Sequence, residues 1–264
     1  MHSVKSLALF LLLTPLAAQP LIVAHRGASH DAPENTLPAF QLAWNQNADA
    51  IEGDFHLTRD GKIICLHDTD TQRTSGTKLI AKHSTLEQLR QLDVGRWKSP
   101  QFTNTRIPTF AEVAATVPNG KKFYIEIKCG PEIIPTLLQE IRTARLKPDQ
   151  VTVISFNADV LRELKRRDRT VRAFWLSSFG KANPLDPSMD QILKTLRTIH
   201  ADGFSSKADP RLTADFLAPL KKHGFEYHCW TVDDPAIAKT FLTIGALSIT
   251  TNRPAFIRQA LSDE

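Results

Sequence analysis

The sequence predicts an α/β protein in which eight parallel strands close into a (β/α)8, or TIM, barrel, with a small insertion after a hairpin on the second strand. Short apolar or β-branched runs alternate along the chain with stretches of helical periodicity, which indicates βαβ units and a parallel sheet. Most of these runs are continuously apolar, which is typical of strands covered on both faces. Their number favours a closed barrel over an open sheet.

The barrel strands are expected in eight segments, provided that the return arm of the hairpin is left out. These are residues 21–25, 51–54, 123–128, 151–156, 171–176, 202–205, 227–232 and 247–250. Helical periodicity separates them. The expected helices are residues 37–44, 110–117, 160–167, 192–199, 216–223, 237–244 and 255–261.

A hairpin and an insertion follow the second strand. The segment HLTRDGKIICLHD contains Asp60-Gly61 between two extended arms, which is a typical hairpin turn. Its arms run antiparallel, so they cannot be two neighbouring strands of a parallel barrel. The region from Thr69 to Ile107 lacks a strong strand and is rich in Thr, Ser, Gln and Lys. We therefore expect an insertion of about residues 56–106 above the barrel mouth.

The first 19 residues are interpreted as a signal peptide, followed by a single domain over residues 20–264. Lys5 precedes an apolar run over residues 7–13, and Pro15 and small residues follow. This pattern is typical of a secretory signal, and the run is too short to span a membrane. We expect cleavage near Gln19 and export to the periplasm or the medium, without a lipid anchor because no cysteine follows the cut.

The charge pattern argues against nucleic acid as a partner. The formal net charge is +5, which is modest for 264 residues. The basic run KRRDR, residues 165–169, interrupts a helical pattern and is interpreted as a solvated helix face, with an anionic membrane surface as the alternative. No aromatic residues alternate with it, as single-stranded nucleic acid binding would require. The sequence leaves the oligomeric state open.

The three cysteines, Cys65, Cys129 and Cys229, cannot all pair with one another. Each lies in a segment with the character of a strand, so we interpret them as buried free thiols. The alternative is a single disulfide, for which Cys65 and Cys129 are the candidates because both flank strand ends that carry polar residues.

Polar side chains collect at the carboxyl ends of the expected strands, where TIM barrels carry their chemistry. Residues two apart on a strand share a face, so each close pair points to the same side. The candidate residues are His25 and Arg26 after the first strand, Glu52 and Asp54 on the second, His67 on the hairpin return, and Glu126 and Lys128 on the third.

This set of residue types suits phosphodiester chemistry. Three carboxylates without a neighbouring thiol favour a hard divalent cation, Mg²⁺ or Ca²⁺. Arg26 and Lys128 offer positive charge to an anionic oxygen. Two histidines supply a base for the attacking hydroxyl and an acid for the leaving alkoxide. Trp230 is expected either in the core or as a wall for the glycerol or alkyl part of the substrate.

The sequence resembles the glycerophosphodiester phosphodiesterases over nearly the whole mature chain. The matching motifs are AHRGASHDAPENT, IEGDFHLTRDGKIICLHD, FYIEIK, YHCWTV and SITTNRP, in the order of the family. The resemblance implies a TIM barrel with a small insertion and one divalent metal ion. It also implies residue roles: metal ligands Glu52, Asp54 and Glu126, catalytic histidines His25 and His67, and phosphate contacts Arg26 and Lys128.

Two positions depart from the family pattern. Gly53 stands where a bulky apolar residue is commoner, and Asn252 replaces a frequent Asp. We expect both to alter packing without loss of activity. Glu34, Asn35 and Asp68 are expected to orient the loop and the histidines.

The leading hypothesis is an exported, metal-dependent phosphodiesterase that hydrolyses small glycerophosphodiesters to glycerol 3-phosphate and an alcohol. The first alternative is a lysophospholipase D or another phospholipase acting on membrane lipids, which would need an apolar rim near the insertion. Only Trp97 and Phe102 are large aromatics there, so a soluble substrate is favoured and membrane contact is not required. A catalytically silent barrel that binds anions is disfavoured because both histidines and all three carboxylates are present.

Overall fold

The structure, a computed structural model, describes residues 20–181 and 185–263. The predicted signal peptide, residues 1–19, lies outside the described residues. Among the described residues, no helix has the length and apolar character needed to cross a bilayer.

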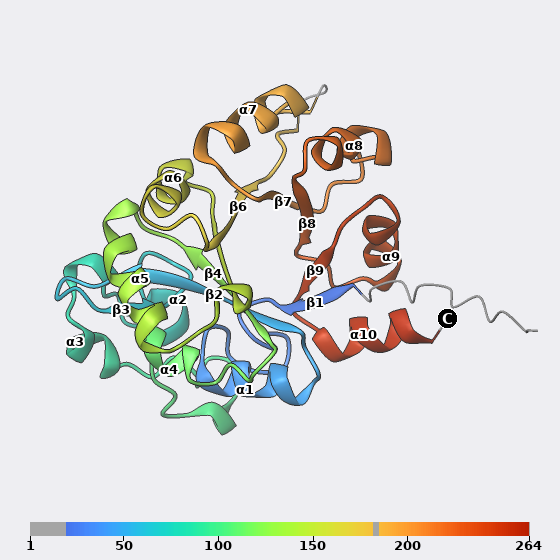
Figure 1. The fold of residues 1–264 in the computed structure, drawn as a ribbon. Coiled ribbons are helices and arrows are strands. Elements are labelled where there is room, and N and C mark those ends of the chain that lie inside the picture. Colours follow the sequence, from blue (N-terminus) through green and yellow to red (C-terminus); the bar gives the residue numbers. More distant parts are fainter. Residues whose placement is uncertain (1–19, 182–184, 264) are drawn as a thin grey trace, which may run out of the picture.

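Eight parallel strands close into a barrel, as the sequence predicts (Figure 1). The sheet has the order β1-β9-β8-β7-β6-β5-β4-β2-β3, and pairing of β1 with β2 closes it. The short strand β3 pairs antiparallel with β2 as the return arm of the hairpin. The strand bounds are β1 Leu21–Ala24, β2 Ala50–Leu57, β3 Ile63–Cys65, β4 Lys122–Ile127, β5 Val151–Ser155, β6 Arg172–Ser177, β7 Gly203–Lys207, β8 Glu226–Trp230 and β9 Ser248–Thr251.

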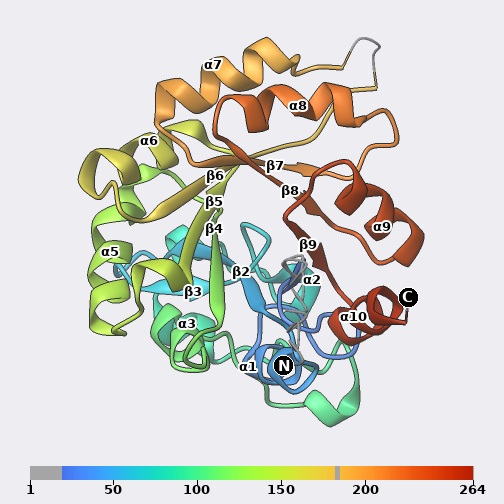
Figure 2. The same ribbon diagram turned by 45° about the vertical axis from the view of Figure 1, so that its right-hand side comes forward.

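Helices surround the barrel and follow most of its strands (Figures 1 and 2). The α-helices are α1 Leu37–Asn45, α2 Gln72–Ser75, α3 Leu86–Arg90, α4 Phe110–Ala114, α5 Ile134–Thr143, α6 Ala158–Arg167, α7 Met189–Ile199, α8 Ala214–Lys222, α9 Pro235–Thr243 and α10 Pro254–Ser262. The short 3₁₀ helices are η1 Ala81–His83, η2 Pro100–Phe102, η3 Pro131–Ile133 and η4 Pro148–Gln150.

Side-chain caps begin several of these helices. The hydroxyl of Thr36 accepts a hydrogen bond from the backbone N–H of Ala39 at the start of α1. Asn157, Ser188 and Asp234 cap α6, α7 and α9 in the same way. Each cap satisfies an N–H that has no partner inside its helix, and this accounts for where these helices begin.

Two helices differ from the sequence prediction. Helix α4 ends at Ala114 rather than at residue 117, because Pro118 follows and the hydroxyl of Thr116 donates to the carbonyl of Val113. Helix α5 was missed because Pro135 reads as a helix breaker. Proline is compatible with the first turn of a helix, and Pro135 lies there.

Three groups of apolar side chains build the core. The largest fills the space between the barrel and its helices. A second group lies on inward-facing barrel positions, and the third forms a separate core in the insertion. The second contains Val23, Ala50, Tyr124, Ile154, Phe174 and Leu176, and the third contains Ile64, Leu66, Ala81, Leu89, Val94 and Ile107. Toward the carboxyl ends of the strands, Ile154 and Leu176 share the barrel interior with polar residues.

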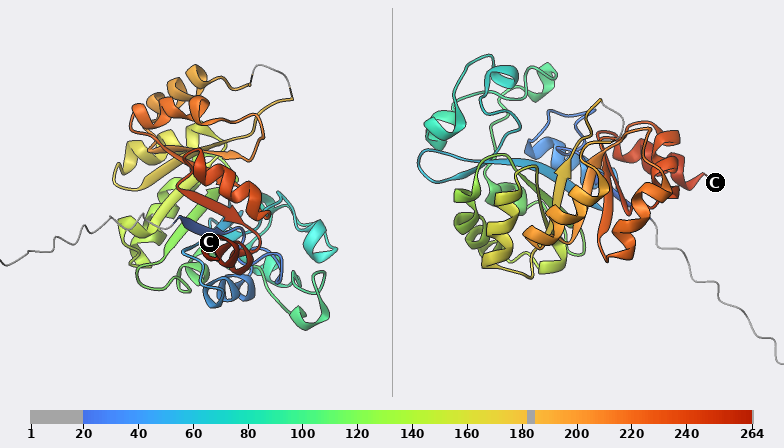
Figure 3. Two further views of the ribbon diagram at one scale, coloured as in Figure 1. Left: turned by 90° about the vertical axis from the view of Figure 1, so that its right-hand side faces the viewer. Right: turned by 90° about the horizontal axis from the view of Figure 1, so that it is seen from above.

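The segment after the hairpin carries α2, η1, α3 and η2 before the chain returns to the barrel at α4. It projects beyond the ring of helices, in teal and green (Figure 3). Strand β2 is longer than predicted because it continues through Leu57 to pair with β3.

Two predictions about individual side chains need correction. Lys165 does not belong to a solvated face: it is buried, and its ammonium lies 2.6 Å from the carboxylate of Asp202. The thiols of Cys65 and Cys229 are free and buried in strands as predicted, and Cys129 is also free. However, Cys129 lies just beyond β4 and is only half-buried, because its strand ends at Ile127.

Candidate active site

A cavity of about 150 Å³ opens at the carboxyl ends of the barrel strands. The structure brings seven of the eight predicted site residues to its walls, and the eighth, Asp54, lies buried behind Arg26 and Lys128. The lining residues are His25, Arg26, Glu52, His67, Tyr124, Glu126, Lys128, Ile154, Phe156, Leu176, Ser205, Trp230, Thr231 and Thr250.

A tight turn after β1 delivers the first two polar residues. Arg26 adopts a left-handed backbone conformation with φ of 55°, and its N–H donates to a carboxylate oxygen of Glu52 at 2.8 Å. Gly27 follows with φ of 79°, and a β-carbon there would lie 2.6 Å from the carbonyl carbon of Ala39. Only glycine fits this position, which explains the His-Arg-Gly sequence.

The barrel register assembles the three carboxylates. Asp54 pairs with Glu126 on the neighbouring strand, and Glu52 lies two residues earlier on the same face as Asp54. Ligand atoms of the three lie within 4.8 Å of one another, and all three residues are buried. One oxygen of Glu52, Oε1, is buried without a hydrogen-bond partner.

Burial and mutual repulsion shift these carboxyl groups. Burial, followed by the charges of Asp54 and Glu126, raises the pKa of Glu52 well above its usual range. Burial and then Asp54 raise the pKa of Glu126 to about 7, although Lys128 opposes the shift. Burial alone would also raise the pKa of Asp54, but Arg26 and Lys128 outweigh it and lower that pKa.

The donor set fits a hard divalent cation. All the candidate ligand atoms are carboxylate oxygens, which Mg²⁺ and Ca²⁺ prefer. The unpartnered Oε1 of Glu52 and the raised pKa of Glu126 describe a site that lacks positive charge. A dication would supply that charge, so the residues present fit the metal ion that the sequence predicts.

Two cations adjoin the carboxylates. The guanidinium of Arg26 lies 2.9 Å from Glu34 and 3.3 Å from Asp54. The ammonium of Lys128 lies 2.6 Å from Glu126 and 3.5 Å from Asp54. Both side chains also line the cavity, so they can contact an anionic ligand there.

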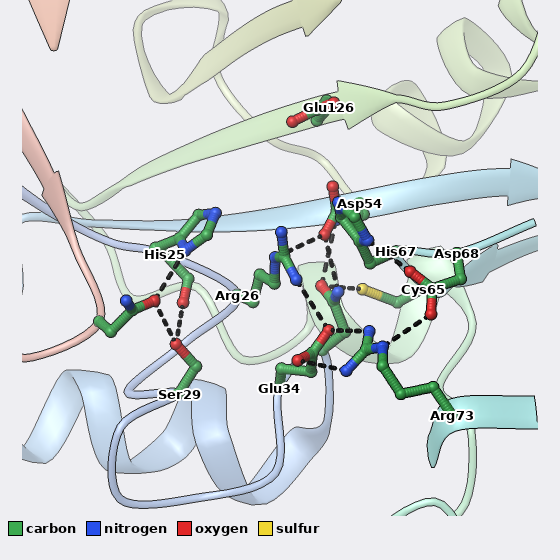
Figure 4. Close-up of polar contacts among 12 residues, drawn as sticks. His25, Arg26, Ser29, Glu34, Asp54, Cys65, His67, Asp68, Arg73 and Glu126 are labelled. Carbon is green, nitrogen blue, oxygen red and sulfur yellow. Dashed lines mark hydrogen bonds and ion pairs between the residues drawn. The ribbon is translucent and has the colours of Figure 1, made fainter. Parts of the chain in front are cut away.

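The loop that follows β1 holds this arrangement in place. Glu34 lies between Arg26 and Arg73 and accepts hydrogen bonds from both, as Figure 4 shows. Asn35 donates to the carboxylate of Asp54 at 2.8 Å and accepts from its backbone N–H at 3.1 Å. Glu34 and Asn35 therefore orient Arg26 and Asp54 rather than the histidines.

Gly53 has a packing explanation. A β-carbon at this position would lie 3.1 Å from the ring of Phe40 and 3.2 Å from the sulfur of Cys65. These two side chains fill the space that a larger residue would occupy, so the departure from the family pattern does alter packing.

His25 is held by Asn252, which directly follows the last barrel strand, β9. Its Nδ1 lies 2.7 Å from Oδ1 of Asn252, and Nδ2 of Asn252 donates to Asp233 at 2.6 Å. The hydroxyl of Ser29 also donates to Asn252 Oδ1 at 2.8 Å. Burial, followed by the charge of Arg26, lowers the pKa of His25 to about 4. Neither Asn252 nor Asp233 was predicted to contact a site residue.

The contacts of Asn252 define the tautomer of His25. Because a carboxylate can only accept, the amide nitrogen of Asn252 must face Asp233, and its oxygen must face His25. Nδ1 of His25 therefore carries the proton, and Nε2 carries the free lone pair. The SITTNRP motif could have revealed this contact, since a closed barrel places its last strand beside its first.

His67 has a different partner. Its Nδ1 lies 2.7 Å from the carboxylate of Asp68, which also accepts from Arg73 at 2.7 Å. Burial would raise the pKa of Asp68, but Arg73 and His67 lower it to about 2. Asp68 is therefore ionised at neutral pH, and its contact with Nδ1 fixes the orientation of the His67 ring.

Aromatic rings form the wall opposite the hairpin. Trp230 contacts Phe156 edge to face, with ring centroids 5.5 Å apart. Trp230 also packs on the apolar residues inside the barrel, and it lines the cavity.

A TIM barrel that gathers an oxygen-ligand site, two histidines and two cations around one cavity is the framework of a hydrolase for phosphate esters. The model of the glycerophosphoryl diester phosphodiesterase family matches residues 25–256 of the chain. The chain belongs to this family, and it is an enzyme of the phosphoric diester hydrolase class.

Curated relatives agree with this assignment. A putative glycerophosphodiester phosphodiesterase of Bacillus subtilis is 32% identical over 249 residues, which covers 89% of this chain and 96% of that protein. A glycerophosphodiester phosphodiesterase of Caldanaerobacter subterraneus is 30% identical over 240 residues, covering 89% of this chain and 94% of that protein.

Solved structures share the fold. A phosphodiesterase of Oleispira antarctica in complex with the product sn-glycerol-3-phosphate has a TM-score of 0.83 and 24% identity, and the match covers 92% of this chain and 97% of that one. A putative glycerophosphoryl diester phosphodiesterase of Silicibacter pomeroyi has a TM-score of 0.81 and 21% identity, covering 92% and 93%.

Proposed function

We propose that the protein hydrolyses soluble glycerophosphodiesters to sn-glycerol 3-phosphate and an alcohol, with a divalent cation and two histidines. The observation that carries this proposal is a cavity of about 150 Å³ lined by two histidines and by Glu52 and Glu126, two members of the cluster of three carboxylates. The Oleispira protein, which shares the fold, is described in complex with the same product.

His25 is proposed as the first base. The tautomer set by Asn252 leaves Nε2 free to accept a proton, and the lowered pKa of about 4 keeps the ring neutral at physiological pH. Nε2 then takes the proton from the 2-hydroxyl of the glycerol group as its oxygen bonds to phosphorus. A neighbouring hydroxyl is already close to phosphorus, so this attack gains from proximity.

His67 is proposed as the acid of the same step. As the bond from phosphorus to the alcohol oxygen breaks, protonated His67 transfers its proton to that oxygen. Asp68 stabilises the charged ring before the transfer. In the second step His67, now neutral, takes a proton from water as the water oxygen opens the cyclic phosphate, and His25 returns its proton to the departing 2-oxygen.

The cations around the cavity are proposed to stabilise the negative charge on the phosphate oxygens. Arg26 and Lys128 are placed to contact the phosphate oxygens, where negative charge increases during the reaction. A divalent cation held by Glu52, Asp54 and Glu126, Mg²⁺ or Ca²⁺, would bind a phosphate oxygen and offset more of this charge.

A substrate screen tests the proposal. Purified protein is assayed, with and without EDTA, for glycerol 3-phosphate release from glycerophosphocholine, glycerophosphoethanolamine and glycerophosphoglycerol. Turnover of lysophosphatidylcholine is followed by the release of choline and lysophosphatidic acid. We expect turnover of the soluble diesters, loss of turnover in EDTA, and recovery with Mg²⁺ or Ca²⁺. Full activity in metal-stripped protein contradicts the metal proposal, and turnover of lysophosphatidylcholine alone favours the lipid-directed alternative.

We also propose that the enzyme is exported. The support is the composition of residues 1–19, with Lys5 before an apolar run and small residues near Gln19. N-terminal sequencing of protein recovered from outside the cytoplasm should give a start near Gln19. A start at Met1 contradicts cleavage.

A further inference from the structure

A second cavity lies beside the candidate active site, on the side of the hairpin. It measures about 490 Å³ and is bounded by the end of β2, by η1 and by the loop after β4. We call it the hairpin groove. Its lining residues are His56, Leu57, Thr58, Arg59, Thr69, Ile80, Lys82, Lys128, Cys129, Gly130 and Glu132.

The hairpin groove adjoins the reacting groups at two points. Lys128 lines both the groove and the catalytic cavity, so the two spaces adjoin at this side chain. His56 lines the groove, and its Nε2 lies 3.4 Å from the backbone carbonyl oxygen of His67. A ligand that passes Lys128 on the side of His67 therefore enters the hairpin groove.

The volumes of the two cavities and the in-line geometry of phosphoryl transfer indicate which part of the substrate each cavity binds. A glycerol group suits the catalytic cavity of about 150 Å³, whose far wall is formed by Phe156 and Trp230. In phosphoryl transfer the attacking and leaving oxygens lie roughly in line on opposite sides of phosphorus. An attack from the glycerol side, near His25, therefore expels the alcohol toward His67 and the hairpin groove.

The charged side chains of the hairpin groove indicate which kind of ligand it binds. Within residues 20–181 and 185–263, no ion pair joins Arg59 or Lys82 to a carboxylate. Arg73, from the same part of the chain, is paired with both Glu34 and Asp68. Arg59 and Lys82 are exposed and available to a ligand.

The other titratable groups of the groove do not cancel this charge. Glu132 is the single carboxylate among the lining residues, and it accepts a hydrogen bond from the backbone N–H of Gly130. Burial raises the pKa of the Cys129 thiol to about 11, so this thiol is neutral at pH 7. Lys128 is already paired with Glu126.

We propose that the hairpin groove is the subsite for the leaving alcohol, and that it favours an alcohol that carries its own anionic group, such as a carboxylate or a phosphate. Arg59 and Lys82 recognise that group, while Lys128 remains with the scissile phosphate. This inference rests on the proposed phosphodiesterase function and adds a substrate class to it.

Two substrates that differ by one carboxylate test the proposal. Glycerophosphoserine and glycerophosphoethanolamine share the scissile bond and the amine, and only the first has the carboxylate. We expect kcat/KM to be about fivefold higher for glycerophosphoserine at low ionic strength, from two exposed cation contacts. The preference should shrink toward unity at about 1 M salt, where such contacts are screened.

Charge-reversal variants test whether Arg59 and Lys82 cause the preference for glycerophosphoserine. The double variant Arg59→Glu with Lys82→Glu should prefer glycerophosphoethanolamine, because the two new carboxylates repel the carboxylate of glycerophosphoserine. Lys62→Glu is the matched control: Lys62 is exposed in the same hairpin but lines a different cavity, with Glu140. It should keep the parent preference.

The subsite proposal is overturned if the double variant keeps the preference for glycerophosphoserine. It is also overturned if Lys62→Glu loses that preference to the same extent as the double variant. A binding measurement separates this failure from failure of the phosphodiesterase proposal. In the His67→Asn background, calorimetry should show that glycerophosphoserine binds more tightly than glycerophosphoethanolamine. Adding Arg59→Glu and Lys82→Glu to that background should remove this difference in affinity. If the parent protein releases no glycerol 3-phosphate but this difference persists, the catalytic proposal fails and the groove assignment survives as a binding site.

Discussion

Nδ1 of His25 lies 2.7 Å from the amide oxygen of Asn252, although 227 residues separate the two in sequence. Asp233 orients the amide from the other side through a 2.6 Å hydrogen bond. These contacts fix the orientation of the Asn252 amide. A neutral side chain therefore determines which ring nitrogen of His25 carries the free lone pair. The charged partner in the site belongs to His67, whose Nδ1 contacts Asp68.

The first prediction concerns Asn252. Replacing Asn252 by Leu removes the acceptor for Nδ1–H, so His25 should populate both tautomers. We expect kcat to fall by at least about tenfold, part of the roughly 10²- to 10⁴-fold that a positioned base contributes. Ring ¹⁵N chemical shifts of His25, assigned with a His25→Ala sample, should move from the Nδ1–H pattern toward a mixture.

Ser29→Ala is the control for Asn252. It removes a second donor to the same oxygen but leaves the contact between Asn252 and Asp233 intact. Its tautomer pattern should match that of the parent protein. If Asn252→Leu leaves the nitrogen shifts of His25 unchanged, the amide does not define the tautomer.

The second prediction concerns the pH dependence of metal binding. Burial and Asp54 raise the pKa of Glu126 to about 7, above its usual 4.5, so the metal-free protein retains a proton there below pH 7. Metal binding must release that proton, and apparent affinity should fall by up to about tenfold per pH unit as the pH drops below 7. Calorimetry in buffers of different ionisation enthalpy counts the released protons.

A glutamine at position 126 serves as the comparison. Glu126→Gln removes one ligand charge and one titrating proton but keeps the shape of the side chain. Affinity at pH 8 should drop, and its pH dependence between 6 and 8 should become shallower by the one proton that Glu126 contributes, while Glu52 still titrates. The fold should persist in circular dichroism. An unchanged metal titration would show that Glu126 is not a ligand.

The third prediction separates the roles of the two histidines. Alanine at His25 or His67 should lower kcat for natural diesters by about 10²- to 10⁴-fold with little change in melting temperature. A p-nitrophenyl ester of glycerol 3-phosphate has a leaving group that needs no acid. On this substrate His67→Ala should recover most of the rate, whereas His25→Ala should not.

Two results count against these roles. Retention of more than about a tenth of the rate on natural diesters by His67→Ala would show that His67 carries no proton, because even a weak acid contributes more. Recovery of His25→Ala rather than His67→Ala on the p-nitrophenyl ester would reverse the assignment.

The fourth prediction concerns the nucleophile. If the 2-hydroxyl of glycerol attacks first, a substrate with hydrogen at that carbon loses its nucleophile while it keeps its phosphate contacts. Turnover should collapse, and competitive inhibition of the parent reaction should remain. A 2-deoxy substrate that turns over within about tenfold of the parent rate means that water attacks directly, without the gain from proximity.

The fifth prediction concerns the cysteines. Denatured, unreduced protein should contain three free thiols, since Cys65, Cys129 and Cys229 are all unpaired. In the native protein Cys129 should react alone, because the other two are buried, and it should react slowly because burial raises its pKa to about 11. A count of one thiol after denaturation would mean that a disulfide forms.

Several elements could be predicted from local patterns alone. The end of β1, just before His25, follows a continuous apolar run, and the hairpin follows from Asp60-Gly61. Periodicity was misleading where proline intervened: helix α5 tolerates Pro135 in its first turn, and α4 stops before Pro118. Whether a proline ends a helix or begins one depends on its place in the helix.

The burial of charged residues could not be predicted in the same way. Lys165 belongs to a run of basic residues, and yet the structure buries it against Asp202. Its neighbours Arg166 and Arg167 remain outside and pair with Glu163. Only the packing of α6 on the barrel decides which member of the run faces inward.

The sequence by itself determined the number of barrel strands, the turn after β1 and the chemical types at the strand ends, because these depend on short-range periodicity and on the special backbone of Gly27. Only the tertiary structure decided which polar groups meet. The parallel register places Asp54 beside Glu126, and closure of β9 on β1 brings Asn252 to His25. Pairing between distant strands is set by the whole barrel, so no local pattern contains it.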